Sequence, residues 1–365
     1  MKPWLALVLL AASAGCTGCA GNAEPLGVRT QETIHGSDDR REYFEIPRAD
    51  VRSLVGRSIV ALIPRALLDD SGRAIAQGVT SLREREGLCE SVAFAEQPAA
   101  AFCSGVLLDE DLVLTAGHCV HQLALRDFRV AFDYFYSAPG ALVPDVREPL
   151  EIVAEALPRP GDARQLDYAW LRLRAKAAAP PRRPVGVRWE HPALAWGEPL
   201  RVISAGGGIP LKIDDGARHR GVSALGPAYF NADSDTLHAS SGGGAFDSNL
   251  ALSGVLTRGG ADFVETPPGC RVSAHEANPD TAKETFLHAF EAVHGLCESA
   301  PRESALCAPA CDLTCRNATR SEFAASAGCA VARRPSAPSA PWSWAFLAAW
   351  LAVGRVRTSY GRARR

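Results

Sequence analysis

The chain has 365 residues, which is enough for one large domain or two ordinary ones. Its apolar content of 47% and charged content of 22% are typical of a globular protein that buries a core. The net charge of −2 provides no overall positive field, which argues against nucleic acid as a partner.

The first residues have the pattern of an export signal. One lysine precedes an apolar run from Trp4 to Ala12, and small residues follow it. The run is too short to span a bilayer, so it predicts a secretory signal peptide over residues 1–23. Lipidation of Cys16 remains an alternative. Residues 24–50 are polar and charged, which indicates a propeptide or an N-terminal arm.

Short apolar runs bounded by turn residues recur from residue 51 onward, among them SIVALI, LVLTA, AWLRL and LSGVLT. Runs of four to six residues rich in valine and leucine predict strands. No long amphipathic helix alternates with them, which disfavours a doubly wound α/β fold. One helix is expected near the end, capped by Asp280 and closed by Gly295. The sequence thus predicts an all-β domain over 51–295 that is finished by a helix.

Eleven cysteines favour an oxidising compartment, unless they bind metal. Five of them lie in a predicted Cys-rich linker over residues 296–330. Disulfides are the expected state of that linker in an exported chain, and a zinc knob is the alternative. If Cys16, Cys19 and Cys329 are set aside for processing, eight cysteines remain for four bridges.

The C-terminal residues 331–365 combine an apolar stretch at 341–354 with a following arginine cluster. Together with the upstream AGC at 327–329, this order resembles the C-terminal sorting tails of myxobacterial surface proteins. The resemblance implies processing near Cys329 and a short helix that enters the membrane transiently or permanently. The chain is therefore expected outside the cell or at its surface.

A histidine with catalytic potential lies in the stretch CSGVLLDEDLVLTAGHCV, which covers residues 103–120. Cys103 and Cys119 bracket His118, and a hairpin of that length would allow them to pair. A disulfide beside His118 would fix the orientation of its imidazole. A buried structural histidine is the simpler alternative, but the bracketed pattern is specific.

A carboxylate and a nucleophile complete the pattern. Asp167 directly precedes the apolar strand AWLRL, where burial is costly unless the carboxylate is paired. Such a carboxylate could hold the Nδ1–H of His118. In LHASSGGGAF, three glycines follow Ser241, of which Gly242 and Gly243 permit a tight chain path, with Ser240 as the rival nucleophile. The backbone N–H groups of Ala239 and Ser241 would then form an oxyanion hole.

Taken together, TAGHC, DYAWLRL and SSGGG resemble the trypsin-like serine peptidases of the chymotrypsin fold over residues 50–295. The order His118, Asp167, Ser241 excludes the α/β-hydrolase arrangement. The resemblance implies two packed six-stranded antiparallel β-barrels, protein or peptide substrates, and catalysis without a cofactor or a metal. IHGSDDR at 34–40 is similar to the start of the mature bacterial enzymes that include the glutamyl endopeptidases.

Several residues depart from the family pattern or leave its specificity open. Ala239 replaces a glycine, and its Cβ restricts the backbone. Ser240 replaces the aspartate that animal trypsins pair with a freed amino terminus. Asp235 lies at the trypsin offset for binding arginine or lysine, whereas Arg258 would favour an acidic side chain. A catalytically inactive homologue that binds protein at the cell surface is the alternative to an enzyme, and a purely structural disulfide-rich protein leaves TAGHC unexplained.

Overall fold

The computed structural model describes residues 34–71, 74–141, 145–156, 166–177, 182–189, 192–267, 269–299 and 306–307. All of these belong to the first of two compact units, which covers Met1–Thr314. The predicted signal peptide, the C-terminal tail and most of the Cys-rich linker lie outside the described residues. No helix among the described residues is long and apolar enough to cross a membrane.

The first sheet is an antiparallel barrel. Its strand order is β7-β6-β3-β4-β5-β9-β8, so β7 pairs with β6 at one edge and β8 pairs with β9 at the other. Only Glu151 separates β7 from β8, so these two strands are one bent segment that closes a six-stranded barrel. The strands are β3 (Ile59–Pro64), β4 (Cys103–Asp109), β5 (Leu112–Thr115), β6 (Phe128–Phe135), β7 (Asp145–Leu150), β8 (Ile152–Ala156) and β9 (Ala169–Leu173).

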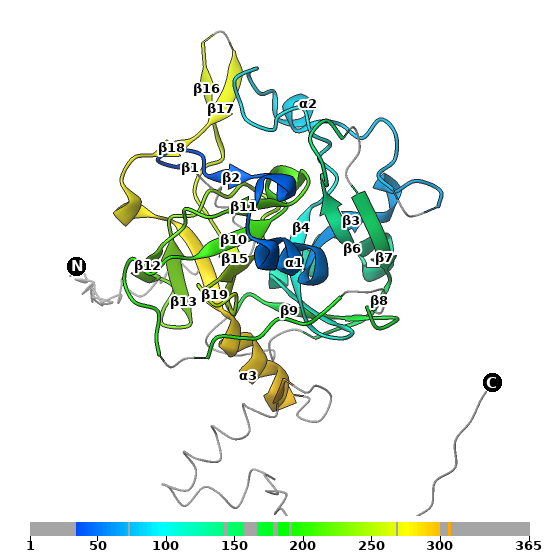
Figure 1. Ribbon diagram of the computed structural model, residues 1–365, viewed down its shortest axis with the longest axis vertical. Coiled ribbons are helices and arrows are strands. Elements are labelled where there is room, and N and C mark those ends of the chain that lie inside the picture. The colour runs from blue at the N-terminus through cyan, green and yellow to red at the C-terminus, as the bar shows by residue number, and fades with distance from the viewer. Residues whose placement is uncertain are drawn as a thin grey trace, which may run out of the picture. The chain divides into compact units, whose positions relative to one another are not determined.

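The second sheet closes in the same way, and Figure 1 shows it beside the first. Its order is β12-β13-β19-β15-β14-β10-β11-β2, and only residues 215–218 separate β11 from β12. The six-stranded core therefore gains β2 as an added edge strand. The strands are β2 (Arg40–Arg41), β10 (Arg201–Ser204), β11 (Lys212–Asp214), β12 (His219–Val222), β13 (Tyr229–Ala232), β14 (Gly244–Phe246), β15 (Leu252–Arg258) and β19 (Glu284–His288).

These two barrels confirm the predicted all-β, chymotrypsin-like fold class. Their strands bury the valines, leucines and isoleucines of the apolar runs, and the aromatic side chains of Phe132, Trp170 and Phe230 are at most 1% exposed. Two small additions complete the strands: β1 (Ile34–His35) runs parallel to β18 (His275–Glu276), and β16 (Phe263–Thr266) forms a hairpin with β17 (Cys270–Ser273). In Figure 1 this hairpin projects from the second barrel.

The helices are few and short. In α1 (Ala49–Ser58) the buried residues Val51, Leu54, Val55 and Ser58 follow helical spacing and form one packed face. The other helices are α2 (Leu82–Glu86) and α3 (Ala289–Ser299). Single 3-10 turns cover Tyr43–Glu45, Arg65–Leu67, Gly117–His121, Leu125–Asp127, Gly206–Gly208 and Pro279–Thr281.

The predicted helix between Asp280 and Gly295 is wrong in its first half. Glu284–His288 forms β19, which pairs with both β13 and β15 in the centre of the second sheet. Phe286 and Leu287 fit either a helix face or a fully buried strand, so their spacing could not decide between the two. The helix begins at Ala289 and continues past Gly295 to Ser299.

Three disulfides join described residues: Cys89–Cys270, Cys103–Cys119 and Cys297–Cys307. The first ties the loop that contains α2 to the β16–β17 hairpin, and the third joins Cys297 in α3 to Cys307. Cys103–Cys119 is the pair expected from the sequence.

Candidate active site

His118 and Asp167 meet because their strands are antiparallel neighbours. Thr115 ends β5 opposite Ala169, which begins β9. His118 follows β5 and Asp167 precedes β9, so both residues lie beyond the same end of this strand pair. Asp167 Oδ2 lies 2.8 Å from His118 Nδ1, and Asp167 Oδ1 accepts the backbone N–H of His118 at 2.9 Å.

Gly117 allows this close approach. A Cβ at position 117 would lie 2.9 Å from Asp167 Oδ1 and 2.9 Å from the carbonyl oxygen of Tyr168. Any side chain there would push the carboxylate away from the histidine. On its other side, Asp167 is held by the second barrel, because its backbone N–H donates to the hydroxyl of Tyr229 at 2.8 Å.

The pair is electrostatically suited to orient an imidazole. The Asp167 side chain is only 11% exposed, whereas that of His118 is 38% exposed. Burial by itself would raise the pKa of Asp167, but the hydrogen bonds and charge of His118, with a smaller contribution from Arg258, lower it below its ordinary value. An ionised Asp167 accepts the Nδ1–H of His118, which leaves Nε2 as the basic nitrogen.

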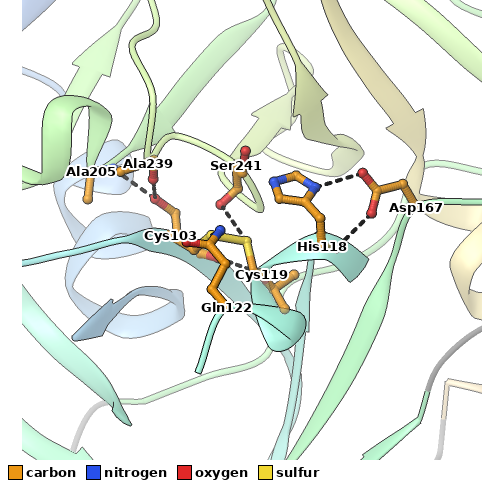
Figure 2. Close-up of a disulfide and its surroundings, with 10 residues drawn as sticks. Cys103, His118, Cys119, Gln122, Asp167, Ala205, Ala239 and Ser241 are labelled. Atoms are coloured by element: carbon orange, nitrogen blue, oxygen red, sulfur yellow. Dashed lines mark hydrogen bonds and ion pairs between the residues drawn. A yellow bond between two sulfur atoms is a disulfide. The ribbon is translucent and has the colours of Figure 1, made fainter. Parts of the chain in front are cut away.

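Ser241 enters the same place from the second barrel, on the loop between β13 and β14. The backbone N–H of Ser104, in β4, donates to the carbonyl oxygen of Ser241 at 2.8 Å. Figure 2 shows the His118 ring between Asp167 and Ser241, with its second nitrogen on the serine side. The described residues include no hydrogen bond between Ser241 Oγ and His118 Nε2, and such contacts are commonly long before substrate binds.

Ser240 faces the opposite way. It is fully buried, its Oγ accepts the backbone N–H of Leu237 at 3.2 Å, and Ser204 Oγ lies 3.0 Å from it. Ser241 is 8% exposed and is the serine beside the histidine. Of the two serines in the stretch, Ser241 is the one that lies on the His118 side.

The backbone before Ser241 has the form that an oxyanion hole needs. Ala239 adopts a φ of +69°, in the left-handed region that favours glycine. Its carbonyl oxygen is turned inward and accepts from Ser104 Oγ at 3.3 Å. Within the described part of the chain, the N–H groups of Ala239 and Ser241 have no acceptor, so both remain available to an anion.

The Cys103–Cys119 disulfide beside this site argues against metal binding by the two cysteines and His118. Sulfur and nitrogen atoms of Cys103, His118 and Cys119 lie within 4.8 Å of one another, as in a metal site. Both sulfurs belong to the Cys103–Cys119 bond, which leaves His118 as a single ligand. The disulfide instead fixes the turn that bears His118 to the start of β4.

The two specificity candidates lie in different surroundings. Asp235 is 4% exposed, and burial raises its pKa despite the N–H groups of Asp39 and His35 that bind it. Arg258 ends β15 and is half-buried, and its charge acts on Asp167. Among the described residues, Arg258 has no hydrogen-bond or ion-pair partner for its guanidinium.

Three positioning residues escaped the sequence analysis. Ser104 binds the carbonyl groups of both Ala239 and Ser241, Tyr229 binds the backbone of Asp167, and Gly117 makes room for its carboxylate. Ser104 and Gly117 lie within the CSG and TAGHC motifs, so these motifs are the sequence signal that could have identified them. Nothing local marks Tyr229, which reaches the site only through the packing of the two barrels.

Comparison with known protein families finds a match over part of the chain. Residues 103–255 match the trypsin-like peptidase domain. The match contains His118, Asp167 and Ser241, and it begins at Cys103. No curated protein matches the chain.

Solved structures of protease folds are similar to the chain at low identity. The scabies mite inactivated protease paralogue S-I1 is 16% identical with a TM-score of 0.40, and the match covers 55% of this chain and 89% of that one. The inactive form of the Rv3671c protease is 17% identical with a TM-score of 0.39, covering 69% and 93%. An inactive serine-to-alanine mutant of Rv3671c from M. tuberculosis H37Rv is 17% identical with a TM-score of 0.40, covering 75% and 99%.

Proposed function

We propose that the protein is an exported serine endopeptidase in which Ser241, His118 and Asp167 form the catalytic triad. One observation carries the proposal: a histidine oriented by a buried carboxylate lies beside a serine whose loop presents two unused backbone N–H groups. A structural role would not require the free donors or the exposed histidine edge.

In the proposed reaction, Ser241 Oγ attacks the carbonyl carbon of the scissile peptide bond while His118 Nε2 takes the hydroxyl proton. The N–H groups of Ala239 and Ser241 donate to the oxyanion of the tetrahedral intermediate. His118 then gives its proton to the leaving amine, and an acyl-enzyme remains on Ser241. Water, deprotonated by His118, hydrolyses that ester and restores the serine. Asp167 stays ionised and stabilises the imidazolium throughout.

Export is supported by the chemistry of the cysteines. The three disulfides among the described residues are stable in an oxidising compartment and rare in a reducing cytosol. The predicted signal peptide and the sorting tail fit the same location. We infer that the mature protein works outside the cell or at its surface.

The test is covalent labelling of the purified, oxidised protein with a fluorophosphonate probe, together with casein turnover. Wild-type protein should incorporate the probe and cleave casein, and Ser241→Ala should do neither. Ser240→Ala is the matched control and should still incorporate the probe, because its hydroxyl is buried against Ser204. A folded wild-type protein that neither labels nor cleaves casein would instead be the inactive, protein-binding homologue.

Arg258 gives the proposed enzyme a preference that can be tested separately. Its guanidinium is unpartnered within the described residues and acts electrostatically on Asp167, so it lies near the reacting groups. We propose that it attracts an acidic substrate side chain. In a peptide library, Arg258→Ala should lower the rate for acidic peptides relative to neutral ones, whereas Arg258→Lys should retain part of the preference.

A further inference from the structure

Asp235, the residue at the trypsin offset for binding a basic side chain, is already occupied by the chain's own N-terminal segment. The backbone N–H of His35 donates to Asp235 Oδ1 at 2.7 Å, and that of Asp39 donates to Asp235 Oδ2 at 2.7 Å. Each carboxylate oxygen therefore has an amide partner nearly 200 residues away in the sequence. Such paired amides stabilise a buried carboxylate without any ligand.

A second carboxylate lies behind the first. Asp214 accepts the N–H of Asp235 at 2.8 Å and that of Gly216 at 2.8 Å. Arg40 lies beside both carboxylates, 7% exposed and bidentate to Asp38. Burial opposes the charge of Arg40, but the hydrogen bonds and charge of Asp38 raise the Arg40 pKa, and the charges of Asp235 and Asp214 contribute less.

The space around Asp235 is closed to a basic side chain. The cavity there is lined by Arg40, Lys212, Asp214, Asp235 and Ser204 among others, and it has room for about one water molecule. Two of its walls are cationic. An arginine or lysine side chain of a substrate would meet Arg40 and Lys212 as well as the two aspartates, and it would have to displace the N–H groups of His35 and Asp39 from Asp235.

The segment that closes this space is built into the second barrel. Its strand β1 runs beside β18, and β2 pairs with β11 through Ile213 and Asp214. The ring of His35 bonds to Glu284 in β19. Residues 34–41, here called the arm, thus contact the second sheet at β11 and β19 and pair with β18 outside it, besides binding Asp235.

The loop from Asp235 to Ser241 is tight enough to transmit this anchoring. Thr236 N–H donates to the carbonyl of Ser234, and Ser240 N–H donates to that of Leu237 at 3.0 Å. The Ser240 hydroxyl oxygen in turn accepts the N–H of Leu237 at 3.2 Å. A displacement of Asp235 would therefore move the nucleophile and the oxyanion-hole amides together.

We infer that Asp235 is a positioning residue which locks the arm beneath the nucleophile loop, and that it does not select basic substrate residues. The inference rests on the proposed peptidase function. It assigns residues 34–41 to the working enzyme rather than to a removable propeptide. Anchoring of the loop then needs no freed amino terminus, because internal amides occupy the carboxylate.

Asp235→Asn is the first variant, since its amide NH₂ would face one of the arm's N–H groups. Cleavage rates are measured across a library that varies the residue before the scissile bond. The expected result is a uniform loss of kcat/KM of about tenfold or more, mostly in kcat, with the ratio of basic to neutral substrates unchanged. Asp233→Asn is the matched control, because Asp233 is a half-buried neighbour that pairs with Arg220 instead.

Asp39→Pro tests the arm directly, because proline lacks the N–H that reaches Asp235. Asp39→Ala, which keeps that N–H, controls for the lost carboxylate. If both changes break the same contact, the double variant Asp39→Pro/Asp235→Asn should lose less kcat/KM than the product of the two single fold-losses. Thermal midpoints of all variants establish that each is folded at the assay temperature.

Selective loss of cleavage after arginine and lysine in Asp235→Asn would overturn the inference, because Asp235 would then be a substrate anchor. An effect no larger than that of Asp233→Asn, or fully multiplicative losses in the double variant, would also overturn it. An unreactive wild-type protein would refute the proposed function, and the inference with it. The two failures are distinguished by fluorophosphonate labelling of the wild type.

Discussion

Gly117 offers the sharpest test of how the His118–Asp167 pair is held. In Gly117→Ala the new Cβ would lie 2.9 Å from Asp167 Oδ1, 2.9 Å from Tyr168 O and 3.1 Å from Tyr168 N. Two of these three atoms belong to the backbone and yield little. Reaching an ordinary contact of 3.4 Å requires the carboxylate to move by about 0.5 Å.

Such a shift would lengthen the 2.8 Å contact between Asp167 and His118 Nδ1 to about 3.3 Å, beyond the usual range for a strong hydrogen bond. Small displacements of catalytic groups cost on the order of 100-fold in rate, and we expect a kcat loss of that size with little change in KM. Overpacking should also lower the free energy of unfolding by about 1–3 kcal/mol.

The assay is steady-state cleavage of a peptide ester and an amide, with thermal unfolding of the same samples. Gly186→Ala is the matched control, because Gly186 is exposed and has no atom within 4 Å of an added Cβ. If Gly117→Ala kept kcat within about threefold of the control, the close approach of Asp167 would not be what positions His118.

Three further outcomes are expected. Ala239→Gly should leave kcat within about threefold and raise the free energy of unfolding by at most about 1 kcal/mol, since relieved strain is partly offset by chain entropy; a tenfold or larger gain in activity would mean that the alanine misshapes the oxyanion hole. Replacing Cys103 and Cys119 together by serine should cost about 3 kcal/mol of stability for a loop of this length, measured by urea unfolding, and no change would contradict this. Because the pKa of Asp167 is lowered in the folded state, its stabilisation is present above the ordinary carboxyl pKa and is lost as pH falls through the lowered value. The difference in free energy of unfolding between wild type and Asp167→Asn should therefore shrink in acid. A difference that is constant with pH would refute this stabilising role of the Asp167 charge.

The sequence by itself determined the class of the fold and the chemistry to look for. Valine- and leucine-rich runs of four to six residues between turn signals favour buried strands, and most lie within strands of the two barrels. TAGHC and DYAWLRL mark His118 and Asp167 because a catalytic imidazole needs a fixed loop and a buried partner. Local chemistry could carry these inferences, since each depends on residues adjacent in the chain.

Tertiary structure decided whatever depended on distant partners. Glu284–His288 became a strand because β13 and β15 flank it, although its apolar spacing suits a helix equally well. Ser240 is fully buried because its hydroxyl bonds to Ser204, 36 positions earlier, whereas Ser241 keeps 8% exposure. The surroundings of Asp235 were set by the amides of His35 and Asp39, about 200 positions earlier. Hydrogen bonds and burial act through space, so a residue's neighbours in the chain cannot reveal which distant group will satisfy it.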